Sequence, residues 1–160
     1  MTVKRANEEH LDLLVPLFNA YRVYYKQPSN LDKAREFLSE RIKNEDSVIF
    51  IALDDKGAAL GFTQLYPIFS SVSAQHIYVL NDIYVDSSRR GLGTGAALLN
   101  KAKEYATEKG AKRIELETDI GNPAQRLYER MGWVKDTKFY HFYWWTEAKF
   151  EGQRIIFCRI

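Results

Sequence analysis

The sequence is short of cysteine, histidine and long apolar runs, and each shortage excludes a class of protein or site. Its only cysteine is Cys158, so no disulfide can form within the chain, and a reducing cytoplasm is the expected location. The three histidines, His10, His76 and His141, lack metal-ligand spacing, so we expect no metal site. No apolar stretch is long enough to span a bilayer, and residues 1–5 lack the apolar segment of a secretory signal. We therefore expect no membrane partner.

The sequence also has little excess charge. Its 23 basic and 21 acidic residues leave a formal net charge of +2, whereas nucleic-acid-binding domains usually carry a concentrated basic patch. Nucleic acid is therefore not expected as a partner. A chain of 160 residues, 46% hydrophobic and 14% aromatic, is long and apolar enough to form the core of one globular domain. No internal repeat, low-complexity tract or linker divides it.

Hydrophobic periodicity predicts two helices, a β-meander, and then alternating strands and helices. Pro16 is expected to kink or divide the first helix, and Pro67 to bend the second strand. A strand–helix–strand unit over residues 77–118 implies one parallel pair, while the meander before it should be antiparallel. We predict an α/β (α+β) fold with a mixed central sheet and helices on both faces. The expected helices follow the cap Asn7 to residue 25 and cover 31–42, 93–110 and 122–132; the expected strands cover 47–53, 58–69, 75–85, 113–118, 139–145 and 154–160, with another beginning at 133.

A glycine-rich segment, Arg89-Arg90-Gly91-Leu92-Gly93-Thr94-Gly95, joins the strand that ends at Val85 to the helix that begins near Gly93. Glycines let a backbone pass close to a bulky ligand and expose bare amides. A helix that begins there directs unpaired N–H groups and the positive end of its dipole outward, which favours phosphate. The two arginines can pair with phosphate oxygens. The segment therefore predicts a seat for a pyrophosphate.

Competing phosphate-binding motifs fit this segment less well. A P-loop needs Gly-Lys-Ser/Thr, but Gly95 is followed by Ala96 and Ala97. A dinucleotide fingerprint needs Gly-x-Gly-x-x-Gly near the start of a βαβ unit, and this segment has other spacing and comes after several elements. A surface turn rich in glycine and arginine stays open as an alternative.

Residues 90–95 resemble the Arg/Gln-x-x-Gly-x-Gly/Ala signature of the GCN5-related N-acetyltransferases (GNAT family). The flanks extend the resemblance: residues 80–86 are similar to that family's fourth strand, 96–99 to the helix that follows, and 122–133 to its second cofactor element. The order of elements fits from residue 1 to about 145, which predicts one GNAT domain over 1–145. Residues 146–160 have no clear counterpart and form a C-terminal extension, either an extra strand or an added tail.

The resemblance implies an enzyme, an N-acetyltransferase that uses acetyl-CoA as co-substrate. It looks closest to the branch that acetylates small amines and amino acids by direct attack in a ternary complex. The pyrophosphate would rest on the amides of the glycine segment, and the pantetheine arm would add alongside the strand, where a backbone N–H would stabilise the oxyanion. Arg89 is either a second phosphate contact or a solvated charge. The cofactor-binding residues expected from the resemblance are Ile83, Tyr84, Val85, Arg90, Gly91, Leu92, Gly93, Thr94, Gly95, Asn122, Ala124 and Tyr128.

One catalytic role follows from the same resemblance, and a second from position in the predicted sheet. Tyr128 would donate a proton to the leaving thiolate, although it could instead be a packed aromatic. Asp82 is the candidate to accept the proton of the amine, directly or through water, with Glu117 and Asp119 as alternatives; each acid could equally satisfy local hydrogen bonds. A covalent acyl-enzyme is not expected, because Cys158 lies outside both motifs.

The acceptor side is less specified. Aromatic residues near the first helix and near the end of the chain could line an acceptor pocket and hold a cationic amine against their faces, or could serve core and interface packing. An aromatic edge strand needs covering, so we expect a homodimer. Two alternatives to a small-amine enzyme stay open: acetylation of a protein lysine or N-terminus, and a non-catalytic acyl-CoA sensor. The aromatic residues in question are Tyr21, Tyr24, Tyr25, Tyr140, Tyr143, Trp144 and Trp145.

Overall fold

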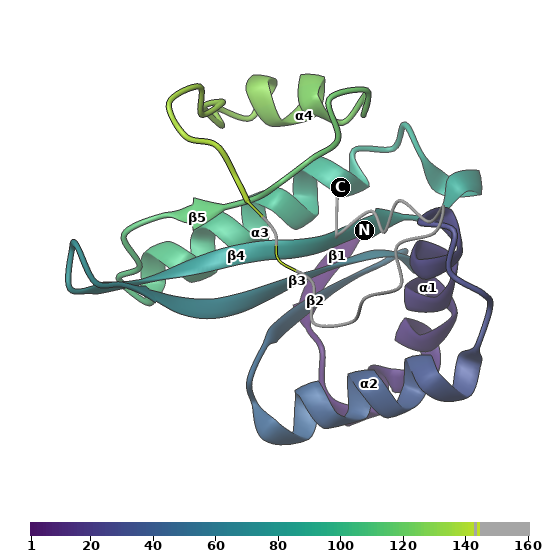
Figure 1. Cartoon of the computed structure of the whole chain (residues 1–160). Coiled ribbons are helices and arrows are strands. Elements are labelled where there is room, and N and C mark those ends of the chain that lie inside the picture. The colour runs from purple at the N-terminus through teal and green to yellow at the C-terminus, as the bar shows by residue number, and fades with distance from the viewer. Residues whose placement is uncertain (143, 145–160) are drawn as a thin grey trace.

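A five-stranded sheet with the order β1-β2-β3-β4-β5 forms the centre of the chain (Figure 1). The structure is a computed structural model that describes residues 1–142 and 144. The first four strands pair antiparallel, and β4 pairs parallel with β5, so the predicted mixed sheet is confirmed. The strands are β1 (Thr2–Arg5), β2 (Val48–Leu53), β3 (Ala59–Ser70), β4 (Gln75–Val85) and β5 (Ile114–Glu115), and the helices are η1 (Glu8–His10), α1 (Leu11–Tyr24), α2 (Leu31–Asn44), η2 (Ser87–Arg89), α3 (Thr94–Glu108) and α4 (Gln125–Arg130).

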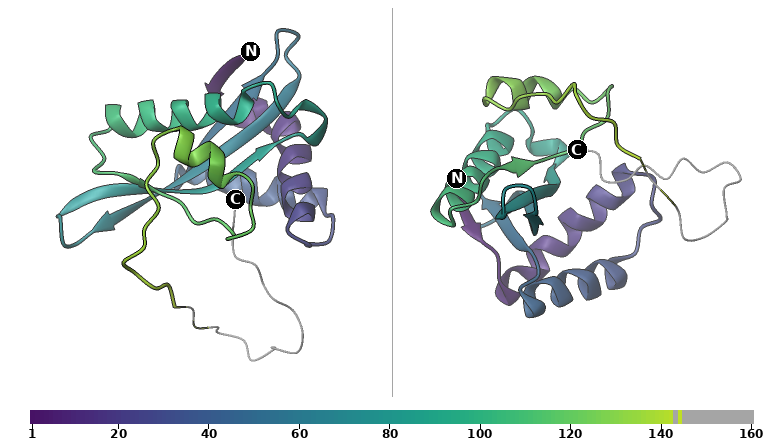
Figure 2. Two further views of the ribbon diagram at one scale, coloured as in Figure 1. Left: turned by 90° about the horizontal axis from the view of Figure 1, so that it is seen from above. Right: turned by 60° about the vertical axis from the view of Figure 1, so that its left-hand side comes forward.

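Helices cover both faces of this sheet: α1 and α2 lie on one face, and α3 lies on the other with α4 beside it (Figures 1 and 2). Strand β2 shows why, since side chains alternate along a strand. Phe50 and Ala52 pack into the cluster that includes Leu98 of α3. Ile49 and Ile51 pack into the second cluster, which α1 and α2 complete. Burying both faces of β2 joins the two halves of the domain.

A β-bulge in β4 sets the orientation of its last residues. Gln64 of β3 lies opposite Asp82, but the next residue of β3 lies opposite Leu80, which leaves Asn81 as the extra residue. A bulge shifts the alternation of side chains by one position. Leu80 before it and Ile83 after it therefore both contact the α3-side cluster, while Tyr84 turns to the α1 side.

The two prolines disturb their elements less than predicted. Helix α1 continues from Leu11 to Tyr24 with Pro16 inside it, and Asn7 caps the short η1 instead of α1. Strand β3 also continues through Pro67, and its irregularity lies earlier, between Gln64 and Leu65. Strand β2 begins at Val48, opposite Leu65, so Pro67 lies beyond the part of β3 that pairs with β2, and a missing N–H is tolerated there.

Of the strands predicted after Gly110, only part of one is present among the described residues. Only Ile114–Glu115 of the expected strand over 113–118 pairs. Gly132 ends the turn after α4 at φ +82°, but residues 133–134 and the described part of 139–145 form no strand. Aromatic and β-branched residues raise β-propensity, yet a strand exists only where a backbone partner is present. Residues 143 and 145–160, with the expected strand over 154–160 and the whole C-terminal extension, lie outside the described residues.

None of the helices in the described part of the chain is long and apolar enough to cross a membrane.

Candidate active site

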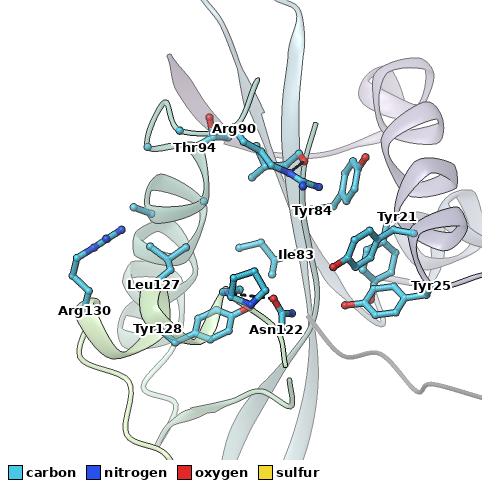
Figure 3. A pocket seen from close by; sticks show the side chains of 18 residues that line it. Tyr21, Tyr25, Ile83, Tyr84, Arg90, Thr94, Asn122, Leu127, Tyr128 and Arg130 are labelled. Carbon is cyan, nitrogen blue, oxygen red and sulfur yellow. Dashed lines mark hydrogen bonds between the residues drawn. The ribbon is translucent and has the colours of Figure 1, made fainter. Parts of the chain in front are cut away.

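A cavity of about 470 Å³ lies at the end of β4, between α1 on one side and the glycine segment with α4 on the other (Figure 3). It brings together eleven of the twelve residues expected to bind the cofactor. The exception is Leu92, whose side chain is 64% exposed and does not line the cavity. The expected residues that do line it are Ile83, Tyr84, Val85, Arg90, Gly91, Gly93, Thr94, Gly95, Asn122, Ala124 and Tyr128.

The glycine segment presents backbone to this cavity. Gly91 and Gly93 have φ of +81° and +80°, a conformation that residues with a side chain rarely adopt. Gly93 is the N-cap of α3, and no side chain caps the helix there. The first amides of an α-helix have no partner within the helix, so those of α3 are available to an anion. The predicted anion seat therefore has the required geometry.

The two arginines of the segment take different positions. The Arg90 Nε donates to the Val85 carbonyl oxygen at 3.3 Å, and Arg90 lines the cavity. Arg89 instead lies 3.8 Å from the Asp54 carboxylate, in the turn between β2 and β3, and is not part of the cavity wall. Arg90 is thus the arginine of the pair that can meet a ligand phosphate.

Strand β4 has one side open to the cavity at Ile83–Val85. On the β5 side, pairing covers only Tyr78 and Val79, and no described strand continues it. On the β3 side the approach is close: a Cβ on Gly61 would lie 2.4 Å from the Tyr84 carbonyl oxygen. An extended ligand could therefore add to this open edge and use main-chain hydrogen bonds.

The Tyr128 side chain is buried in the wall opposite α1. It is 4% exposed, and its hydroxyl has no hydrogen-bond partner among the described residues. Burial raises the pKa of Tyr128 above its usual range, so the hydroxyl stays protonated at neutral pH and can donate. Buried hydroxyls are normally paired, so a donor without a partner among the described residues has the capacity to bind an acceptor atom of a ligand.

Helix α4 is held in place from both ends. The Asn122 Oδ1 accepts from the Ala124 amide at 2.9 Å, which orders the turn before α4. The helix itself begins at Gln125 with Ala124 as its N-cap, three residues later than the expected start at 122. At the other end, the Lys103 ammonium of α3 donates to the Met131 carbonyl oxygen.

The candidate bases do not line the cavity. Asp82 is 3% exposed, and its Oδ1 accepts from the Asn81 side chain at 3.2 Å. Glu117 Oε1 lies 3.2 Å from the Nδ1 of His141, and Asp119 Oδ1 accepts from the Gly121 amide at 2.9 Å. A proton would therefore reach any of these acids through water or another group.

The three tyrosines of α1 that were expected on the acceptor side line the cavity, and the described C-terminal aromatics do not. Tyr21, Tyr24 and Tyr25 line the cavity, whereas Tyr140 and Trp144 are 90% and 85% exposed and do not. Tyr143 and Trp145 lie outside the described residues.

Four further residues line the cavity without having been expected to bind there: Ala96, Pro123, Leu127 and Arg130. Helical spacing could have indicated Leu127 and Arg130, which are three residues apart on α4 and share a face. The contact between α4 and the glycine segment is close, since a Cβ on Gly95 would lie 3.1 Å from Leu127 Cδ2. Within the described residues, no group of three metal-ligating side chains gathers here or elsewhere.

Comparison with known proteins identifies the family. The model of the acetyltransferase (GNAT) family matches residues 14–133. An uncharacterised N-acetyltransferase of Bacillus subtilis, YhfO, is 46% identical over 89% of this chain and 95% of its own length. The crystal structure of a probable acetyltransferase is 40% identical, with a TM-score of 0.87 over 93% of this chain and 100% of its own.

A third protein shares the fold alone. The structure of AAC(6')-Iy in complex with the bisubstrate analogue CoA-S-monomethyl-acetylneamine has a TM-score of 0.72 at 23% identity, over 89% of this chain and 95% of its own. The mixed sheet, the glycine segment at the start of α3 and the match over most of the sequence agree with one another. This chain belongs to the GNAT family and is an N-acetyltransferase.

Proposed function

We propose that this enzyme transfers the acetyl group of acetyl-CoA, the donor that its family uses, to the primary amine of a small molecule such as an amino acid or a polyamine. One observation carries the proposal: the buried hydroxyl of Tyr128 has no partner among the described residues, and Tyr128 lines a cavity that runs from the glycine segment to the tyrosines of α1. A proton donor is thus placed between a wall that suits a pyrophosphate and a wall that suits a second substrate.

The residues of the first wall fit coenzyme A. The amides at the start of α3 and the Arg90 guanidinium would hold the pyrophosphate. The open edge of β4 at Ile83–Val85 would pair with the amides of the pantetheine arm. A backbone N–H of that strand would stabilise the oxyanion that forms on the thioester carbonyl. The Tyr128 hydroxyl would donate to the sulfur.

The reaction would run as direct transfer. The amine nitrogen attacks the thioester carbonyl carbon, a C–N bond forms, and the C–S bond breaks. Tyr128 donates its proton to the departing sulfur. Asp82 accepts the proton of the amine through water, because it does not line the cavity, and solvent returns a proton to Tyr128. In balance, one proton passes from the amine to the sulfur.

Two other functions have less support. A protein lysine or N-terminus carries a peptide chain next to its amine. The tyrosines of α1 line the acceptor side of the cavity and leave less room for such a chain. A non-catalytic acyl-CoA sensor would have no use for the buried donor Tyr128. The expected homodimer and cytoplasmic location stay predictions.

Release of free coenzyme A from acetyl-CoA, measured with a thiol reagent, tests the function. The panel contains small primary amines, amino acids, polyamines and lysine peptides. Turnover with small amines supports the proposal. Turnover only with peptides would replace it by protein acetylation, and tight acetyl-CoA binding without turnover on any acceptor would replace it by a sensor role.

A further inference from the structure

We infer that the tyrosines of α1 and β4 form the acceptor subsite and select amines that carry a single cation on an apolar or aromatic body, against polyamines. This inference rests on the proposed function and narrows its substrate class. It starts from the side of the cavity opposite Tyr128, where Tyr21, Tyr25 and Tyr84 lie across Ile83 from Asn122 and Tyr128 (Figure 3).

The rings of this subsite form one packed group from two elements. Tyr21 and Tyr25 meet edge to face with centroids 5.0 Å apart, and Tyr21 and Tyr84 meet at 6.4 Å. Tyr24 extends the group, 5.1 Å from Tyr25. Tyr21 is 5% exposed, and its hydroxyl lies 3.5 Å from the Asn81 carbonyl oxygen in the bulge of β4. A wall fixed in this way presents preformed aromatic surface, which binds apolar bodies at low entropic cost.

The charges of the cavity decide between amines. None of the 18 described residues that line it is an aspartate or glutamate, and two, Arg90 and Arg130, are cations. Ring faces and phenol oxygens can hold one ammonium. Because none of the described lining residues is a carboxylate that would stabilise the ammonium, the amine can lose its proton before it attacks.

A polyamine would bind in the same cavity less favourably, because it carries more than one ammonium. Each further ammonium would leave water without gaining a carboxylate partner among the described residues that line the cavity. An arylalkylamine brings no further charge, and its ring can pack on the tyrosines. The cavity therefore favours the arylalkylamine.

The experiment measures kcat/KM for 2-phenylethylamine, spermidine and L-lysine at one ionic strength, by release of free coenzyme A. We expect at least a tenfold preference for 2-phenylethylamine over both of the others. An equal or greater value for spermidine or lysine overturns the inference but leaves the proposed function standing. No release with any amine overturns the proposed function itself.

Variants at the end of α1 separate recognition from folding. Tyr21 packs against Phe18 and Phe62 in the core, so its replacement could simply unfold the protein. Tyr25 is the half-buried C-cap of α1 and is the better site. Tyr25→Leu should raise KM for 2-phenylethylamine about tenfold, and Tyr25→Phe should restore most of that loss. Neither should change KM for acetyl-CoA.

Two more variants complete the test. Val23→Leu, on the same helix but outside the cavity wall, should leave both KM values unchanged. Tyr24→Glu places a carboxylate at a position that lines the cavity and is 53% exposed, and should move the preference toward spermidine by several-fold. An unchanged amine preference in both Tyr25→Leu and Tyr24→Glu would assign the acceptor to another part of the protein.

Discussion

The two walls of the cavity are built from different parts of the polypeptide. The wall at the start of α3 presents backbone, through the positive-φ glycines Gly91 and Gly93 and the open edge of β4. The wall at α1 presents side chains, the rings of Tyr21 and Tyr25. Backbone recognition suits a partner that never varies, such as a pyrophosphate, because it constrains only a few side chains. Side-chain recognition can change with the acceptor while the fold stays the same.

In the wall at the start of α3, replacing a backbone contact should have the largest effect on acetyl-CoA binding. Gly93→Val puts a β-branched residue at φ +80° in the wall of the cavity, a conformation it can hardly adopt. We expect no measurable acetyl-CoA binding by calorimetry. Gly57→Val is the matched control, since Gly57 has φ +83° and open space around it in the turn between β2 and β3. It should lose similar stability and keep its affinity; retained affinity in Gly93→Val contradicts the backbone seat.

The Tyr128 hydroxyl should affect kcat more than it affects the binding of acetyl-CoA. Tyr128→Phe removes the hydroxyl that has no partner among the described residues, so little folding energy is lost. We expect kcat to fall about a hundredfold, with KM for acetyl-CoA nearly unchanged. Tyr78→Phe, another buried phenol packed on α3, serves as the control and should keep its kcat. If the two variants have equal kcat, Tyr128 is not the acid.

The charge of Arg90 should contribute less to acetyl-CoA binding than the backbone contact does. Arg90→Gln removes a guanidinium that lines the cavity, and a charged contact of this kind is worth about 1.5–3 kcal/mol. We expect KM for acetyl-CoA to rise at least tenfold, with a weaker dependence on salt. Arg89→Gln is the neighbouring control, because Arg89 faces Asp54 instead. Equal effects of the two substitutions would mean that position along the segment does not decide phosphate contact.

The smallest effect concerns stability at high pH. Burial, followed by a hydrogen bond with Tyr105, raises the pKa of Tyr78 from 10.0 to about 12, and burial also raises the pKa of Tyr128. A folded-state pKa above the unfolded one means that stability is fully present below pH 10 and declines as pH rises toward 12. Urea unfolding at pH 8, 10 and 11 should show this decline, and Tyr78→Phe should lessen it. An identical decline in the variant would place the titration elsewhere.

Local patterns in the sequence predict some elements of the fold and miss others. The bounds expected for β4, residues 75–85, agree with the structure, and α3 begins one residue after Gly93. Both follow from local patterns, an apolar run for β4 and glycine followed by apolar residues at helical spacing for α3. Strand β1 was not predicted, because Thr2–Arg5 is mostly exposed and shows no alternation. Its existence depends on pairing with β2, which lies far along the chain.

The bulge at Asn81 was equally hidden. Residues 77–85 are apolar except for Asn81 and Asp82. No local pattern indicates that the alternation of side chains shifts by one position between Leu80 and Ile83. The register of β3 against β4 makes that change. The same register places Asp82 away from the cavity wall.

The sequence by itself determined the wall that we propose for the pyrophosphate, because seven consecutive residues set both the turn and the start of α3. Only the tertiary structure decided the facing wall. Tyr21 meets the bulge of β4 across a separation of 60 residues, and Tyr128 of α4 is buried in the cluster that includes Leu98 of α3. Contacts of that range depend on the packing of whole elements, which no short pattern of residues specifies.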